Sequence, residues 1–166
     1  MRRLLRVNLS SGKIKEEDIP KKVQNDFVGA RGFCARYLYD EVKPNIDPLG
    51  PENKLFLTVG PLAGTSAQAS SKWIAVSKSP ITNTYTRSVG GGDFGAWMKW
   101  AGFELLIIEG KAAKPSYLFI KDGKYEILDA SPIWGKTTSQ IQEYLKKKHG
   151  AKARIVCVGP AAQNLG

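Results

Sequence analysis

Val89-Gly90-Gly91-Gly92-Asp93-Phe94-Gly95 decides how the middle of this chain folds, and it runs directly into the helix-like stretch 96–101. Three consecutive glycines carry no Cβ atoms, so the backbone can adopt positive φ there and its N–H groups can approach an anionic ligand. The N-terminus of a following helix adds partial positive charge. Taken alone, the run more often marks a structural turn, because glycine commonly punctuates loops. We therefore predict a turn into a helix, with a phosphate cradle as the alternative.

The composition is that of a folded domain. The chain has 166 residues, of which 42% are hydrophobic and 24% charged, which is enough to build a core and argues against disorder. Its net charge of +10 would attract nucleic acids, anionic membranes or phosphorylated ligands. The charge is spread along the chain, and its one run, Lys146–Lys148, lies where it complements the end of a predicted helix.

Cysteine and histidine usage gives no sign of a metal centre. Cys34 and Cys157 lie far apart in apolar stretches, and we interpret both as small buried hydrophobic residues. His149 stands beside Gly150 at the end of a predicted helix, where a charge or cap neighbour is expected rather than a catalytic base. The sequence has neither a signal peptide nor a run long enough to span a bilayer, so we expect a soluble, cytoplasmic protein without membrane contact.

Upstream of the glycine run, apolar periodicity and proline placement predict short elements. Leu5–Leu9 alternates and leads into the turn Ser10-Ser11-Gly12. The small residues of 60–67 would allow a backbone or a flat ligand to pack closely. The expected elements are a hairpin over 5–15, a short helix beginning at Pro20, a helix carrying Phe33 to Val42, an irregular proline-rich connection over 43–53, and buried strands at 55–59 and 73–77.

Downstream, the pattern changes from helix to strands and back. Asp122-Gly123 is a hairpin turn signal, and Thr137 with Gln140 forms a capping box. The expected elements are a strand over 103–108, hairpin strands at 117–120 and 125–128, a helix from Thr137 to Gly150 that buries Ile141, Tyr144 and Leu145, and a last strand over 154–158. Strands and helices do not alternate regularly, which argues against a doubly wound nucleotide-binding sheet. We predict a mixed α+β fold of two β-sheets with packed helices.

Short motifs recur in order along the whole chain, and together they are specific although each alone is weak. They are Arg6-Val7-Asn8-Leu9 with Ser11-Gly12, Gly29-Ala30-Arg31-Gly32, Asp47-Pro48-Leu49-Gly50-Pro51-Glu52-Asn53-Lys54-Leu55, Gly60-Pro61-Leu62-Ala63-Gly64-Thr65, Lys78-Ser79-Pro80, Gly91-Gly92 with Phe94-Gly95, Ala101-Gly102-Phe103, Glu109-Gly110-Lys111-Ala112, Ile133-Trp134-Gly135-Lys136, and Gly159-Pro160-Ala161 with Asn164-Leu165. On these motifs the chain resembles the N-terminal domain of the tungsten-containing aldehyde ferredoxin oxidoreductases.

The resemblance implies an enzyme that oxidises aldehydes to carboxylic acids with ferredoxin as electron acceptor. Its cofactor would be tungstopterin, in which two molybdopterin dithiolenes hold tungsten and a magnesium ion links their phosphates. Residues 1–166 would form a single cofactor-saddle domain that covers one side of this group. The chain ends directly after a predicted strand and a Gly-Pro-Ala-Ala loop, so we expect it to be truncated at its C-terminal end.

The resemblance also implies the binding residues. Lys72 matches a basic residue that contacts the cofactor, Val89 an asparagine at the phosphate and magnesium end, and Gly91 a glycine of the same loop, with Gly90 and Gly92 beside it. Relatives often have glycines and an arginine where this chain has Ser70-Ser71-Lys72, and lysine offers a point charge instead of a bidentate fork. Val89 has no side-chain amide, so only its backbone carbonyl could serve a metal.

The catalytic residues of the family are implied to lie beyond this chain, together with its second pterin loop and its [4Fe–4S] cluster, so none is expected here and the chain alone is expected to be inactive. A companion polypeptide is one source for those parts. A second interpretation is a stand-alone module that binds a pterin or another phosphate-bearing ligand without redox chemistry. A third is a nucleic-acid-binding domain that stacks bases on Trp73, Tyr85, Trp97 and Trp100. The spacing of these aromatic residues favours core packing, and we expect no specific nucleic-acid binding.

Overall fold

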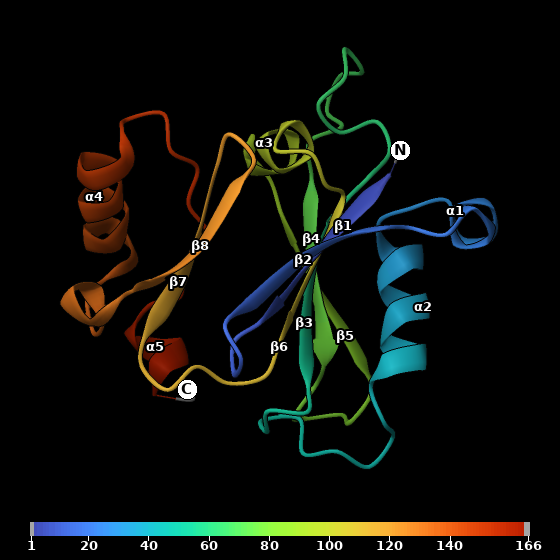
Figure 1. The fold of residues 1–166 in the computed structure, drawn as a ribbon, viewed down its shortest axis with the longest axis horizontal. Coiled ribbons are helices and arrows are strands. Elements are labelled where there is room, and N and C mark those ends of the chain that lie inside the picture. Colours follow the sequence, from blue (N-terminus) through green and yellow to red (C-terminus); the bar gives the residue numbers. More distant parts are fainter. Residues whose placement is uncertain (1, 165–166) are drawn as a thin grey trace.

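The computed structural model describes residues 2–164, which form a six-stranded sheet, a two-stranded sheet and helices packed against them (Figure 1). The strands are β1 (Arg3–Asn8), β2 (Lys13–Asp18), β3 (Lys54–Val59), β4 (Trp73–Lys78), β5 (Tyr85–Gly90), β6 (Leu105–Glu109), β7 (Ser116–Lys121) and β8 (Lys124–Asp129). The helices are α1 (Lys21–Phe27), α2 (Arg31–Glu41), α3 (Phe94–Trp100), α4 (Thr138–His149) and the single turn α5 (Pro160–Gln163), with a 3-10 turn at Ser131–Ile133. The predicted α+β fold with two sheets is confirmed.

The large sheet has the strand order β2-β1-β6-β3-β4-β5. Its neighbours are antiparallel except β1 and β6, which pair in parallel and join segments about one hundred residues apart. The expected opening hairpin is β1–β2, and the absence of βαβ repeats from residues 2–164 agrees with the sequence prediction. No helix in that range is long and apolar enough to cross a membrane.

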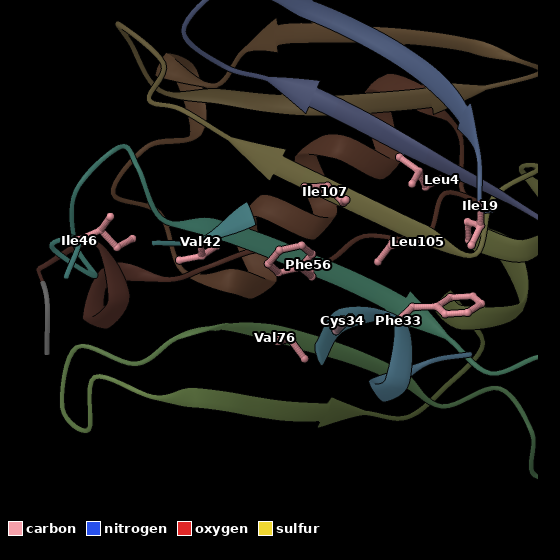
Figure 2. Packing of buried hydrophobic residues seen from close by; sticks show 10 residues of the cluster. All are labelled: Leu4, Ile19, Phe33, Cys34, Val42, Ile46, Phe56, Val76, Leu105 and Ile107. Carbon is pink, nitrogen blue, oxygen red and sulfur yellow. The ribbon is translucent and has the colours of Figure 1, made fainter. Parts of the chain in front are cut away.

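The central strands bury both of their faces. On one face, Phe33 and Cys34 of α2 pack against Phe56 of β3 and against Leu105 and Ile107 of β6 (Figure 2). On the other face, a second cluster lies beneath α3 and the β7–β8 hairpin, and its buried members are Leu5, Val7, Leu57, Val59, Ala63, Met98, Phe103 and Leu106. Neighbouring residues of a strand enter opposite clusters, as the period-2 alternation of a strand requires.

The α4 helix forms a third, smaller cluster with the turn before it. The predicted capping box is present. The Thr137 hydroxyl accepts a hydrogen bond from the backbone N–H of Gln140 at 3.4 Å, and the side-chain oxygen of Gln140 accepts one from the backbone N–H of Thr137 at 3.0 Å. Ile141 and Leu145 are buried as expected. Tyr144 is 37% exposed, so its predicted burial was wrong. One helical turn separates Ile141 from Leu145, whereas Tyr144 lies at the margin of that face.

One predicted strand does not form among the described residues, and one observed strand was not predicted, for the same physical reason. Residues 154–158 belong to no ladder, although Ile155 and Cys157 pack inward and their neighbours are exposed as in a strand. Conversely, Tyr85–Gly90 forms the edge strand β5 although its composition is polar. A strand depends on a hydrogen-bonding partner, which is available to β5 along β4 and is missing for 154–158 among the described residues.

Candidate functional site

The residues expected to bind a cofactor meet at one corner of the large sheet. In the β4–β5 pair, Trp73 lies opposite Gly90 and Ile74 opposite Val89. Lys72 directly precedes Trp73, so it stands at the same end of the sheet as the glycine run. The register therefore brings together all five predicted positions, Lys72 and 89–92, from two segments of the chain.

Gly90 is the last residue of β5, and the side chain of Trp73 occupies the space beside its Cα. A Cβ at Gly90 would overlap with the indole ring of Trp73. The same indole packs edge-on against Phe94, the first residue of α3, with ring centroids 5.4 Å apart. Gly90 thus allows one aromatic side chain to cover the edge strand and to anchor the helix that follows.

Gly95 allows a second close contact, between α3 and the segment before β4. It is buried in the first turn of α3, and a Cβ there would overlap with the backbone carbonyl of Ser71. The helix therefore lies directly on the segment that leads into β4. Because Lys72 follows Ser71, this contact fixes the backbone that carries its exposed side chain.

Gly91 and Gly92 are exposed, and no atom lies within 4 Å of the place where a Cβ would be. Gly92 has φ +76°, which confirms the predicted positive φ for this member of the run. No packing contact within residues 2–164 requires glycine at these two positions. They are the part of the run at which a ligand can reach the backbone.

Val89 is 47% exposed and lies on the edge strand. Within the described residues β5 pairs on one side only, so part of its backbone polar groups face away from the sheet. The valine side chain offers no donor or acceptor, which leaves the main-chain carbonyl as the sole group that could reach a cation.

The start of α3 already faces a carboxylate. Asp93 stands at the N-cap, and its side chain accepts a hydrogen bond from Arg154 Nε at 2.5 Å. The Arg154 guanidinium also lies over the Trp97 ring, 5.1 Å from its centroid. Since α3 has seven residues, its dipole is small, and any anion at this corner depends on the loop backbone and Lys72.

The small-residue loop before β4 folds on itself through hydroxyl groups. Ser70 Oγ donates to the carbonyls of Leu62 (2.9 Å) and Ala67 (2.8 Å), and Thr65 Oγ1 donates to Leu62 at 2.7 Å. Trp100 Nε1 donates to the Gly64 carbonyl at 2.9 Å. These bonds hold the loop against the end of α3.

The aromatic residues near the corner are less buried than their spacing suggested. Trp73 and Tyr85 are half-buried against the two large clusters, as expected for core packing. Trp97 and Trp100 are 39% and 62% exposed and pack edge-on against each other at 5.6 Å. For these two tryptophans the core-packing prediction was wrong, because Gly95, Ala96 and Met98 form the buried face of α3.

Thiols and histidine offer no metal ligation among the described residues. No group of three His, Cys, Asp or Glu side chains is placed to hold a metal ion between residues 2 and 164. Burial raises the pKa of Cys34 to about 12 and also raises that of the half-buried Cys157. Burial lowers the pKa of His149, whose ring stacks on Phe119 with centroids 4.2 Å apart.

Two arginines that were not predicted as site residues lie together on the α2 face of the large sheet, beside Tyr85. Arg87 is on β5, and Arg31 begins α2. Both line a surface depression beside Tyr85. The signal that could have found Arg87 is the alternation Tyr85, Arg87, Val89, but the polar residues between them hid the strand.

Comparison with known proteins identifies relatives over nearly the whole chain. Residues 4–166 match the family described as "Aldehyde ferredoxin oxidoreductase, N-terminal domain". The tungsten-containing aldehyde ferredoxin oxidoreductase of Pyrococcus furiosus is 45% identical over 164 residues, which are 98% of this chain and 27% of that protein. The aliphatic sulfonate oxidoreductase, WOR-like subunit, of the same organism is 35% identical over 178 residues, covering 98% of this chain and 28% of that protein.

A solved structure has the same fold. It is the active site complex BamBC of benzoyl coenzyme A reductase with 1,5-dienoyl-CoA, which matches with a TM-score of 0.95 and 32% identity. The match covers 98% of this chain and 25% of that chain. The chain thus spans about a quarter of the length of these relatives.

Proposed function

The chain belongs to the aldehyde ferredoxin oxidoreductase family as its N-terminal domain, and from this we propose that it forms one side of the binding surface for a tungsten bis-pterin cofactor. The complete enzyme would oxidise aldehydes to carboxylic acids and pass electrons to ferredoxin. The observation that carries the proposal is Gly91, which is exposed and has neither a packing neighbour nor a positive φ that would require glycine, beside the equally exposed Gly92.

The corner fits the phosphate end of such a cofactor. The N–H groups at Gly91 and Gly92 can approach phosphate oxygens without a Cβ in the way, and Lys72 adds a positive charge beside them. The Val89 carbonyl is the group available to the magnesium ion. Gly90 contributes through its backbone, because Trp73 already fills the space beside it.

This chain's own residues bind and orient the cofactor, whereas the tungsten and pterins supply the redox chemistry when bound. Trp73, packed on Gly90 and Phe94, holds the loop in place, and Gly95 sets the distance between α3 and the segment that carries Lys72. The second pterin loop, the [4Fe–4S] cluster and the catalytic acid and histidine would come from the remainder of the enzyme or from a companion polypeptide.

The names of the relatives favour a role for this chain in binding the cofactor and not in selecting the substrate. One relative is named for aldehydes, one for aliphatic sulfonates, and the solved structure for benzoyl coenzyme A reduction. All match nearly the whole of this chain. A region common to enzymes with such different substrates is better suited to a shared cofactor.

Metal and pterin analysis of protein purified from its native host tests the proposal. Tungsten and pterin should copurify with this chain, either on one polypeptide or in a stable complex with a cluster-bearing partner. Pterin without tungsten or partner would favour the stand-alone binding module. Protein free of tungsten, pterin and partner would contradict the proposal.

A further inference from the structure

A second candidate site lies on the α2 face of the sheet. The turn between α1 and α2 and the start of β5 enclose an open depression of about 550 Å³, lined by Arg31, Tyr85 and Arg87 and by the backbone of Gly29 and Gly32. Tyr85 packs against the α2-side cluster, whereas Gly90 lies beneath Trp73 on the opposite face. Neither Lys72 nor any of residues 89–92 lines the depression, so it is distinct from the glycine run.

The two arginines here differ from the other arginines of the chain. Each of the other five forms an ion pair with a carboxylate, and they are Arg2, Arg3, Arg6, Arg36 and Arg154. Arg31 and Arg87 form no ion pair within residues 2–164, and they line the same depression, which contains no acidic side chain. Two like charges are thus placed together without a counter-ion from this part of the chain.

The helix end at the depression adds no negative charge. The first turn of α2 has no acidic residue, and its N-cap, Ala30, gives no side-chain hydrogen bond. An eleven-residue helix therefore directs the positive end of its dipole toward a region that already holds two guanidinium groups.

We propose that this depression binds the dianionic phosphate group of a small phosphomonoester. Guanidinium groups bind phosphate oxygens in bidentate fashion, and two of them match two negative charges. Ligand pockets commonly have volumes of about 300–1,000 Å³, so the depression has room for an organic group attached to the phosphate.

Titration of the full chain with inorganic phosphate, glycerol 3-phosphate and acetate, followed by calorimetry and by backbone amide shifts, tests this proposal. Both phosphates should bind and should shift the amides of Gly29 and Gly32, whereas acetate should bind more weakly. Arg87→Gln and Arg31→Gln should each weaken phosphate binding by about tenfold, which corresponds to one charge-assisted hydrogen bond. Tyr85→Phe should leave phosphate binding unchanged, because its hydroxyl is buried and out of reach of a ligand in the depression.

Arg36→Gln is the matched control, because it removes the same charge from the same helix at a residue paired with Asp40. It should leave phosphate affinity within about twofold. Absence of phosphate binding to the unaltered chain, or equal losses in Arg36→Gln and Arg87→Gln, would overturn the proposal. Gly91→Val separates this site from the cofactor surface, since it should preserve phosphate binding even where the cofactor is lost.

Discussion

The glycine loop has a packed part and an open part. Gly90 and Gly95 lie against Trp73 and the Ser71 carbonyl, where a Cβ would overlap with existing atoms. Gly91 and Gly92, between them in sequence, have open space at the same position. One residue type thus serves two purposes within six residues. The packed glycines hold α3 and β4 together, and the open glycines leave a surface free for a ligand.

This difference changes the meaning of the glycine run. A run of glycines is consistent with a turn or with a ligand cradle, and the printed sequence does not separate the two. The neighbouring residues show which glycines are packed and which are open, because Trp73 and Ser71 come from a different segment and fill the space beside only two of them. Substitutions at Gly90 and Gly95 should therefore lower stability through overlap with their neighbours, whereas substitutions at Gly91 and Gly92 should lower cofactor binding.

Gly95→Ala should have the largest effect on folding. Its Cβ would overlap with a backbone oxygen that cannot rotate away, so we expect a loss of about 1–3 kcal/mol in the free energy of unfolding. Urea denaturation would measure it. If the contact were loose, alanine would instead stabilise the helix by about 1 kcal/mol relative to glycine, which would contradict the close packing.

Gly90→Ala should have a smaller effect, because the atoms in its way belong to a side chain that can move. We expect a loss of about 1 kcal/mol, of the size found for modest overpacking. A double-mutant cycle with Trp73→Leu provides the check. The penalty of Gly90→Ala should shrink in the Trp73→Leu background, and an unchanged penalty would show that the indole is not its cause.

Gly92→Ala has a matched control in Gly123→Ala. The two glycines have φ values of +76° and +75° and open space around them, so alanine should cost each about 1 kcal/mol of stability through backbone strain alone. In protein from the native host, only Gly92→Ala should also reduce tungsten content. Equal tungsten content in the two variants would place Gly92 outside the cofactor surface.

Lys72→Met should change stability by less than about 0.5 kcal/mol, because the side chain is exposed. It should reduce the tungsten and pterin content by removing a positive charge at the phosphate end, and Lys72→Arg should restore it. Lys43→Met removes a charge from an exposed lysine in the connection after α2 and serves as the control. Equal cofactor content in the two methionine variants would show that only overall charge matters.

Much of the fold could be predicted from sequence because apolar runs and caps are local signals. The buried strands β3 and β6, the Asp122-Gly123 hairpin and the Thr137 capping box follow from neighbouring residues. The edge strand β5 does not, since its side chains are polar and its existence depends on the β4 backbone. The unpaired segment 154–158 is the reverse case, with a strand-like pattern and no partner among the described residues.

The glycine run stood out from its residues as a turn or a phosphate cradle, but the full set of candidate site residues came from family motifs. Lys72 and residues 89–92 were named by resemblance, and their meeting at one corner follows from the β4–β5 register, which the sequence does not reveal. Arg31 and Arg87 were missed as site residues because what distinguishes them is the lack of a carboxylate partner. That property becomes visible only when every ion pair of the described residues is known.

The most direct test of the two-part loop is the cofactor content of Gly91→Val compared with Ala113→Val, in protein purified from the native host. Both residues are exposed and neither has positive φ, and Ala113 lies beyond the opposite end of the sheet, so both variants should fold with nearly unchanged stability. We predict that Gly91→Val loses most of its tungsten and pterin and that Ala113→Val retains them. Full cofactor content in Gly91→Val would contradict the assignment of the open glycines to the cofactor surface.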